Sequence, residues 1–252
     1  MKAAIVIPAR LGATRLPRKP LRELGGKPLI IRVWERVSRM GVGDMVVVAT
    51  DRSEVADILH EVGATVVMTS SACASGTERV AEVAFRSEFA EYDTFVNVQG
   101  DEPLIGKGCV QGATEMVTSG RFELGTAAVR ADDSIFERNA IVKVVIGVDG
   151  RALYFSRAPI PYLRDVADAP TRGPWTLQHI GVYAYSRDAL ERWTQLPPHP
   201  LEEIERLEQL RPLAHGMNMG VALINEQPEG GIDTEIDLQR ANERWTTFAT
   251  GY

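Results

Sequence analysis

The segment AAIVIPARLGATRLPRKP, residues 3–20, joins a short apolar run to a loop rich in arginine and lysine. Residues 3–7 contain three β-branched side chains and are followed by Pro8, a pattern typical of a buried β-strand. The loop that follows carries Arg10, Arg15, Arg18 and Lys19. Because open α/β sheets bind ligands beyond the carboxyl ends of their strands, this loop is predicted to border a ligand site.

Beyond this loop, strand-like and helix-like segments alternate. The predicted helices cover residues 28–39, 53–62 and about 77–89, and the predicted strands cover 45–49, 65–68 and 94–98. This alternation predicts an α/β fold with a mostly parallel sheet and helices on both faces.

After Phe122 the chain becomes richer in strands. The strand-like segments are 124–130, 141–148, 153–155, 179–185 and 219–224. Asp149-Gly150 favours a hairpin turn, so we expect a mixed or antiparallel extension of the same sheet. No linker-like segment stands out, which predicts a single domain over residues 1–252.

Two further helices are predicted in the second half of the chain. One covers 200–211, ends at Pro212 and has four apolar residues facing the core: Leu201, Ile204, Leu207 and Leu210. The other covers 234–248 and closes the chain.

The composition excludes several classes of protein. Of 252 residues, 44% are hydrophobic and 25% are charged, which argues against a disordered, collagen-like or disulfide-stapled chain. Cys73 and Cys109 are too far apart for a CxxC site and suggest a reducing compartment. No apolar run is long enough for a signal peptide or a membrane span, so we expect a cytoplasmic protein.

The charge is distributed unevenly. The whole chain has a net charge of −6, which argues against a nucleic-acid or membrane binder. Residues 1–28, however, contain seven basic residues and one acidic residue, so this segment carries +6 and the rest of the chain carries −12. This cluster predicts a polyphosphate-binding loop, with a solvated surface loop as the alternative. The Walker and dinucleotide glycine motifs are both absent.

Carboxylates follow another predicted strand. In FVNVQGDEP, residues 95–103, Asp101 and Glu102 come at the same edge of the sheet as the basic loop. A carboxylate beside a polyphosphate favours a Mg²⁺ site. Asp233 precedes the last helix within GGIDT, and the residues alone slightly favour a helix N-cap there over a metal ligand.

Other kinds of site have weaker support. The four histidines lack zinc-site spacing, and Ser75 lacks the glycines of a nucleophile elbow. We expect most glutamates of 200–211 to face solvent and at most one to reach a ligand.

The sequence resembles the 3-deoxy-manno-octulosonate (Kdo) cytidylyltransferases, or CMP-Kdo synthetases, over nearly its whole length. The matching stretches are IPARLGATRLPRKPL (7–21), VVATDRSEV (47–55), SGTERVAEV (75–83), VNVQGDEPLI (96–105), ALYFSRAPIPY (152–162), QHIGVYAYSR (178–187), PLEEIERLEQLR (200–211) and GIDT (231–234). The first and fourth occur broadly among nucleotidyltransferases, whereas ALYFSR, HIGVYAY and LEQLR together are much more specific.

This resemblance implies a Rossmann-like nucleotide-diphospho-sugar transferase fold. It implies Mg²⁺-dependent transfer of CMP from CTP to the anomeric hydroxyl of Kdo, with release of pyrophosphate, for lipopolysaccharide synthesis. Residues 1–120 would form a nucleotide-binding half, and 121–252 a sugar-binding and dimerisation half. A homodimer is implied as well, with residues 153–162 as a candidate contact surface.

The resemblance also implies roles for individual residues. Arg10, Arg15 and Lys19 would bind the triphosphate, Ser75 and Gly76 the cytosine, and Asp101 and Asp233 the metal. Gln99 would lie between nucleotide and sugar. The sugar pocket would be lined by Arg157, His179, Tyr183 and Glu208. For Arg157 and His179, buried structural pairing is the alternative.

The chain departs from the family pattern at three places. A small hydroxyl residue is usual where Ala13 stands, and glycine is usual where Arg18 stands. If that position needs φ > 0, Arg18 is strained; otherwise it adds a cation to the loop. The family's D-T-P-E-D is replaced by DTEID at 233–237, which changes the start of the last helix.

Two alternative functions remain open. One is the same reaction on an 8-amino analogue of Kdo or another acidic sugar. The other is a catalytically silent nucleotide-binding protein, for which Ala13 and Arg18 are the only support.

Overall fold

The computed structural model describes residues 1–12, 15–226 and 229–249, so Ala13 lies outside the described residues. The chain forms two compact units. The first contains Lys2–Lys107 and Glu229–Tyr252, and the second contains Met1 and Gly108–Pro228. These units differ from the halves expected on either side of residue 120, because the C-terminal segment folds with the N-terminal strands.

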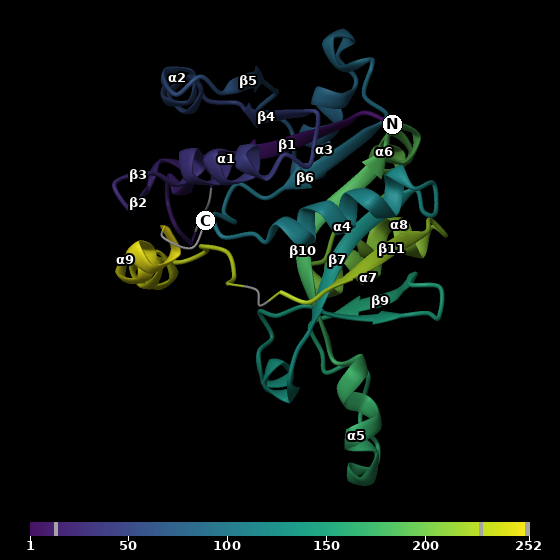
Figure 1. The fold of residues 1–252 in the computed structure, drawn as a ribbon. Coiled ribbons are helices and arrows are strands. Elements are labelled where there is room, and N and C mark those ends of the chain that lie inside the picture. The colour runs from purple at the N-terminus through teal and green to yellow at the C-terminus, as the bar shows by residue number, and fades with distance from the viewer. Residues whose placement is uncertain (13–14, 227–228, 250–252) are drawn as a thin grey trace. The chain divides into compact units, whose positions relative to one another are not determined.

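The first unit contains four parallel strands in the order β6-β1-β4-β5. In this unit β1 (Ala3–Ala9) lies between β4 (Met45–Thr50) and β6 (Thr94–Val98), and β5 (Thr65–Met68) pairs with β4 (Figure 1). Val6 at the centre of β1 is paired with both Val47 and Asn97. The parallel α/β architecture is therefore confirmed.

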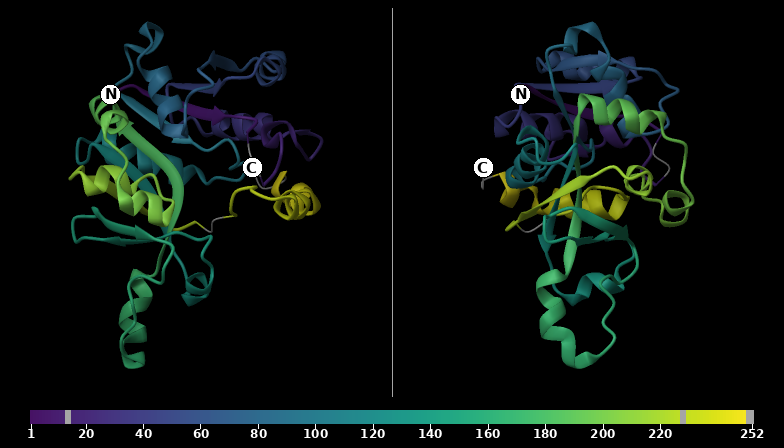
Figure 2. Two further views of the ribbon diagram at one scale, coloured as in Figure 1. Left: turned by 180° about the vertical axis from the view of Figure 1, so that it is seen from behind. Right: turned by 90° about the vertical axis from the view of Figure 1, so that its right-hand side faces the viewer.

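Helices and short turns complete the first unit. They are α1 (Leu29–Met40), α2 (Ser53–Glu61), α3 (Gly76–Ala84), α9 (Glu235–Ala249) and the 3₁₀ turns Lys19–Leu21 and Ser87–Phe89. The helix expected over 77–89 ends early, because the chain tightens into the second 3₁₀ turn. Helix α9 lies beside the small hairpin of β2 (Glu23–Leu24) and β3 (Lys27–Pro28) (Figures 1 and 2).

The second unit has a mixed sheet, as expected from the sequence. In it β7 (Leu124–Arg130) pairs parallel with β11 (Met219–Ile224) and antiparallel with β10 (Leu177–Ser186). The hairpin of β8 (Lys143–Ile146) and β9 (Ala152–Ser156) joins through β8 to β10.

The helices of this unit are α4 (Lys107–Thr118), α5 (Ala169–Arg172), α6 (Arg187–Gln195), α7 (Pro200–Glu205) and α8 (Leu210–Ala214). Three 3₁₀ turns complete it: Asp133–Glu137, Val166–Asp168 and Gly173–Trp175. Helix α5 projects away from β8 and β9 (Figure 2). No helix in the described part of the chain is long and apolar enough to cross a membrane.

The helix predicted over 200–211 is wrong as a continuous element. It stops at Glu205, because Arg206 takes the left-handed conformation with φ 55°. Leu201 and Ile204 are exposed, and only Leu207 and Leu210 are buried. Pro212 lies inside α8 instead of ending a helix.

The break in this helix has a tertiary cause. Helix C-termini leave carbonyl oxygens without intrahelical partners. Here the Arg157 Nε donates to the carbonyl of Glu205 at 2.9 Å, and the Glu205 carboxylate accepts from the Arg157 backbone N–H at 2.9 Å. The first bond occupies a main-chain carbonyl that a continuing helix would use, and the second holds the Glu205 side chain against the segment at Arg157.

Candidate active site

The carboxyl ends of β1 and β6 meet closely in the first unit. A Cβ added at Gly100 would lie 2.6 Å from the carbonyl oxygen of Pro8, so only glycine fits this approach. The contact brings the basic loop after β1 beside Gln99 and Asp101 after β6. The residues predicted to border a ligand site at this edge of the sheet therefore lie together.

A pocket of about 420 Å³ lies at this edge, entirely within the first unit. It is lined by Pro8, Ala9, Arg10, Gly12, Arg15, Lys19, Pro20, Ser75, Gly76, Arg79, Gln99, Gly100, Asp101 and Asp233. Every residue predicted to bind nucleotide or metal is in this set. The lining includes four cations and two carboxylates, a balance that favours a polyanionic ligand.

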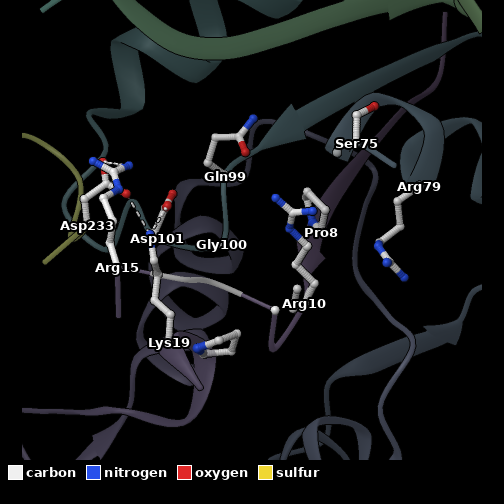
Figure 3. A pocket seen from close by; sticks show the side chains of 14 residues that line it. Pro8, Arg10, Arg15, Lys19, Ser75, Arg79, Gln99, Gly100, Asp101 and Asp233 are labelled. Atoms are coloured by element: carbon white, nitrogen blue, oxygen red, sulfur yellow. Dashed lines mark hydrogen bonds and ion pairs between the residues drawn. The ribbon is translucent and has the colours of Figure 1, made fainter. Parts of the chain in front are cut away.

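One end of the pocket holds a compact charged cluster (Figure 3). The Lys19 Nζ lies 2.7 Å from Asp101 Oδ2 and 2.8 Å from Asp233 Oδ1, and Arg15 lies 3.1 Å from Asp233 Oδ2. Burial acts to lower the pKa of Lys19, but Asp101 and Asp233 outweigh it and the pKa is raised. Lys19 is therefore a fixed cation between two carboxylates from distant parts of the sequence.

Asp233 is not the N-cap of α9, so that alternative is wrong. Thr234 and Asp237 cap the helix instead: Thr234 Oγ1 accepts from the Asp237 N–H at 3.2 Å, and Asp237 Oδ2 accepts from the Thr234 N–H at 2.9 Å. This is a reciprocal capping box. It leaves the Asp233 carboxylate available to the pocket.

Glu102, next to this cluster, has a raised pKa. Burial raises the pKa of Glu102 to about 8, the charges of Asp101 and Asp233 add to the rise, and Lys19 opposes it. A protonated Glu102 is therefore expected near neutral pH.

The other end of the pocket is formed by the start of α3 (Figure 3). Ser75 is the N-cap of this helix, since its side chain accepts from the Glu78 N–H at 3.2 Å. The sequence S-G-T-E at 75–78 matches the S-x-x-E capping pattern and could have revealed this role. The positive end of the helix dipole thus points at the pocket.

Arg79 is a pocket residue that the sequence analysis missed. Its side chain is 3% exposed, contacts Thr69 and lies 3.7 Å from Asp51. The signal available was a charged residue on the apolar face of a short helix, within the matching stretch SGTERVAEV. A nearly buried guanidinium with one distant carboxylate partner is a candidate ligand contact.

The remaining cations of the loop behave differently from one another. Arg10 is exposed and makes no ion pair within residues 1–12, 15–226 and 229–249. Arg18 has φ 56° and pairs with Glu54 at 2.5 Å, away from the pocket lining. Of the two expectations for Arg18, the strained backbone is therefore confirmed and the added pocket cation is wrong.

In the second unit, Arg157 donates to main-chain carbonyls. Its Nε bonds the carbonyl of Glu205 at 2.9 Å, and its Nη1 bonds the carbonyl of Asn139 at 3.1 Å. The buried Lys143 Nζ in turn donates to the Arg157 carbonyl at 2.6 Å. The structural-pairing alternative for Arg157 is thus supported by its bonds.

His179 is buried on β10 beside a β-bulge. Thr126 Oγ1 donates to the Val182 carbonyl at 2.7 Å, so it accepts from His179 Nε2 at 2.9 Å. Burial lowers the pKa of His179 to about 3, which keeps the ring neutral. The Phe155 ring packs edge-on against the His179 ring, with 4.8 Å between the two ring centres. His179 therefore also has a structural partner.

Tyr183 lies next to His179, and Glu208 is close enough to Tyr183 to affect its pKa. The centre of the Tyr183 ring lies 5.5 Å from the centre of the His179 ring. Burial raises the pKa of Tyr183 well above its usual value, and the charges of Tyr185 and Glu208 add to the rise. Tyr183 thus keeps its hydroxyl proton.

Two carboxylates in the pocket could hold a divalent cation. No group of three or more His, Cys, Asp or Glu side chains converges in the described residues. Mg²⁺ is commonly held by one or two carboxylates together with substrate phosphates and water, so Asp101 and Asp233 fit this ion. Zinc sites need more nitrogen or sulfur ligands than this pocket offers.

A parallel sheet with cations and paired carboxylates at its carboxyl edge is suited to a nucleotide-transferring enzyme. A solved 4-diphosphocytidyl-2C-methyl-D-erythritol synthase from Anaerococcus prevotii shares the fold, with a TM-score of 0.63 at 11% identity over 97% of this chain and 98% of that one. A family model described as "Cytidylyltransferase" matches residues 4–219. The chain belongs to this family.

Within that family, its relatives are the 3-deoxy-manno-octulosonate cytidylyltransferases. The enzyme of that name from Gemmatimonas aurantiaca is 57% identical over 97% of this chain and 95% of its own length. The one from Methylococcus capsulatus is 44% identical over 94% of each. A solved CMP:2-keto-3-deoxy-manno-octonic acid synthetase complexed with CTP has a TM-score of 0.90 at 36% identity, over 98% of this chain and all of that one.

Proposed function

We propose that this protein transfers CMP from CTP to the anomeric hydroxyl of Kdo, giving CMP-Kdo and pyrophosphate for lipopolysaccharide synthesis. The anomeric oxygen would form a bond to the α-phosphorus as the bond from that phosphorus to the bridging oxygen of pyrophosphate breaks. The hydroxyl proton would pass to water. The observation that carries the proposal is the Lys19–Asp101–Asp233 cluster in a cationic pocket, in a chain 57% identical to an enzyme of this name.

The triphosphate would be bound by Arg10, Arg15 and Lys19. Phosphoryl transfer needs positioning and charge neutralisation more than covalent chemistry, and fixed cations supply both. Arg10 has its guanidinium available, whereas Lys19 is held in place by its two aspartates. No histidine or glutamate base is required in this scheme.

Asp101 and Asp233 would hold Mg²⁺. When bound, the ion would neutralise developing phosphate charge and lower the pKa of the sugar hydroxyl. Lys19 would screen the mutual repulsion of the two carboxylates and keep them close together.

The cytosine would bind near Ser75, Gly76 and Arg79. A guanidinium only donates hydrogen bonds, so it matches the O2 and N3 acceptors of cytosine. Uracil carries a hydrogen at N3 and cannot accept there. A preference for CTP over UTP follows from this assignment.

For the sugar we propose two kinds of role. Gln99, Tyr183 and Glu208 would contact Kdo through their polar atoms. Arg157 and His179 would shape the wall of the sugar site, since their nitrogen atoms already bond Glu205 and Thr126.

We further propose a cytoplasmic homodimer. Residues 153–162 remain the candidate contact, and both Leu153 and Tyr162 are exposed apolar side chains. Light scattering at micromolar concentration tests this proposal: a dimeric mass supports it and a monomeric mass contradicts it.

The activity is tested by pyrophosphate release with CTP, Kdo and Mg²⁺, with Asp101→Ala as the control. Release no greater than that of the variant would contradict the proposed function. Calorimetric binding of CTP without turnover would instead support a silent nucleotide-binding protein. Parallel assays with UTP and with the 8-amino analogue of Kdo test the nucleotide and the sugar, and faster turnover of the amino sugar would change the substrate assignment.

A further inference from the structure

Asp237 holds the backbone on which Asp233 stands. Its Oδ2 accepts three hydrogen bonds from two consecutive residues: from the Asp233 N–H at 3.2 Å, the Thr234 N–H at 2.9 Å and the Thr234 Oγ1 at 2.8 Å. An ordinary capping box satisfies the N–H of the N-cap residue alone. The additional bond to Asp233 connects the start of α9 directly to the pocket.

The segment before Asp233 is also fixed. The buried Ile232 donates its N–H to the Asp101 carbonyl at 2.9 Å. The backbone at Asp233 is therefore tied on one side to the residue that carries the other carboxylate, and on the other side to Asp237. This double attachment sets how far apart the two carboxylates can be.

Helix α9 gives Asp237 a firm support. Asn242 Oδ1 accepts from the Gly25 N–H at 2.8 Å, and its Nδ2 donates to the Glu23 carbonyl at 3.0 Å. The Arg32 guanidinium lies 4.8 Å from the centre of the Trp245 ring. Gly25 has φ 55°, and a Cβ there would come 2.0 Å from Trp245, so the hairpin fits closely against the helix.

The departures from the family's D-T-P-E-D agree with this arrangement. Glu235 and Ile236 replace the proline and the glutamate, and both are exposed. Thr234 and Asp237, which form the bonds, are kept. The two replaced positions are thus the ones that the capping arrangement does not use.

We infer that Asp237 is a positioning residue that holds Asp233 where its carboxylate meets Lys19 and can bind a divalent cation. The inference rests on the proposed metal role of Asp233. Groups that orient a metal ligand typically account for 10–100-fold in metal affinity. We therefore expect Asp237 to change metal affinity beyond any change in folding stability.

The test is Mn²⁺ binding to the protein–CTP complex, followed by electron paramagnetic resonance. Asp237→Ala should weaken Mn²⁺ binding about tenfold. Asp237→Asn keeps one acceptor oxygen and should have a smaller effect. The matched control is Glu243→Gln, which removes the same charge from an exposed position on the same helix and should leave Mn²⁺ affinity unchanged.

A second variant separates positioning from helix stability. Thr234→Val removes both hydroxyl bonds of the cap but leaves Asp237 bonded to the N–H groups of Asp233 and Thr234. It should lower the urea midpoint of unfolding about as much as Asp237→Asn while changing Mn²⁺ affinity less than twofold. Equal losses of Mn²⁺ affinity in Thr234→Val and Asp237→Asn would overturn the inference.

The variant Asp233→Ala distinguishes a failure of the positioning inference from a failure of the proposed function. If Asp233→Ala weakens Mn²⁺ binding and the Asp237 variants do not, the positioning role is wrong and the proposed function stands. If Asp233→Ala leaves Mn²⁺ binding unchanged, the proposed metal role is wrong and the positioning inference is overturned with it.

Discussion

The polar residues of the two units are bonded in different ways. In the first unit, Lys19 donates to both Asp101 and Asp233 at the wall of an open pocket. In the second unit, Arg157 and His179 direct their nitrogen atoms to carbonyls and to a buried hydroxyl. Polar residues of the family motifs thus line an open pocket in the first unit, whereas in the second unit they bond other groups of the protein itself.

Removing the central cation should have the largest effect. Lys19→Met would leave the two aspartates without the cation that bridges them, and we expect kcat to fall by about 10²–10³. Steady-state pyrophosphate release measures this. Lys27→Met removes an exposed lysine of the same segment that pairs with Glu35, and it should keep the wild-type rate. A loss of under tenfold for Lys19→Met would mean that the bridge is not important for the transfer.

Truncating Arg157 should affect stability first. Arg157→Ala would leave carbonyls at the end of α7 without a donor, and we expect a loss of about 3 kcal/mol in the free energy of unfolding. The affinity for CTP, measured by calorimetry, should stay within twofold because the nucleotide pocket belongs to the other unit. A large loss of CTP affinity in a folded Arg157→Ala protein would contradict the division of roles.

His179 should make the protein less stable in acid. Its pKa of about 3 in the folded state is below the usual 6.5, so only the unfolded chain takes up a proton as the pH falls below 6.5. The protein should lose about 1.4 kcal/mol between pH 7.5 and pH 5.5 from this residue alone.

Urea unfolding at the two pH values measures the His179 effect. His179→Gln should remove this part of the pH dependence, whereas His60→Gln, at an exposed histidine, should retain it. Equal pH dependence in wild type and His179→Gln would show that the ring is charged in the folded state.

Arg18→Gly should give the smallest change, and in the stabilising direction. The left-handed conformation costs a non-glycine residue about 1–2 kcal/mol, while the exposed pair with Glu54 contributes less than about 1 kcal/mol. We expect a net gain of up to about 1 kcal/mol in the free energy of unfolding, because the larger chain entropy of glycine offsets part of it. A destabilised variant would mean that the Glu54 pair outweighs the backbone strain.

Much of the fold could be predicted because strands have local signals. The strands at 65–68, 94–98, 124–130 and 219–224 were predicted to the residue. Helix α4 was missed, since KGCVQGATEMVT contains two glycines and several weak helix formers. Its Gly112 packs so closely on β11 that a Cβ would come 2.7 Å from Ala222. Tertiary packing, which the local sequence does not display, supports this helix.

The members of the candidate site were predictable, but their bonds were not. Charge segregation and family motifs pointed to Lys19, Asp101 and Asp233 as residues of one site. That Ser75 caps α3 could have been recognised, because S-x-x-E is a local pattern. That Lys19 joins both aspartates could not, because these carboxylates lie 82 and 214 residues away along the chain.

The parallel strands, the basic loop at the end of the first strand and the family to which the chain belongs could all be recognised without coordinates. Those properties follow from apolar periodicity and residue type, which are local. The long-range bonds came from the fold alone: Lys19 bonds both aspartates, and Arg157 bonds the carbonyl of Glu205 where α7 ends. A polar group takes its partner from whatever donors and acceptors the fold brings within about 3 Å, and distance along the sequence does not limit that choice.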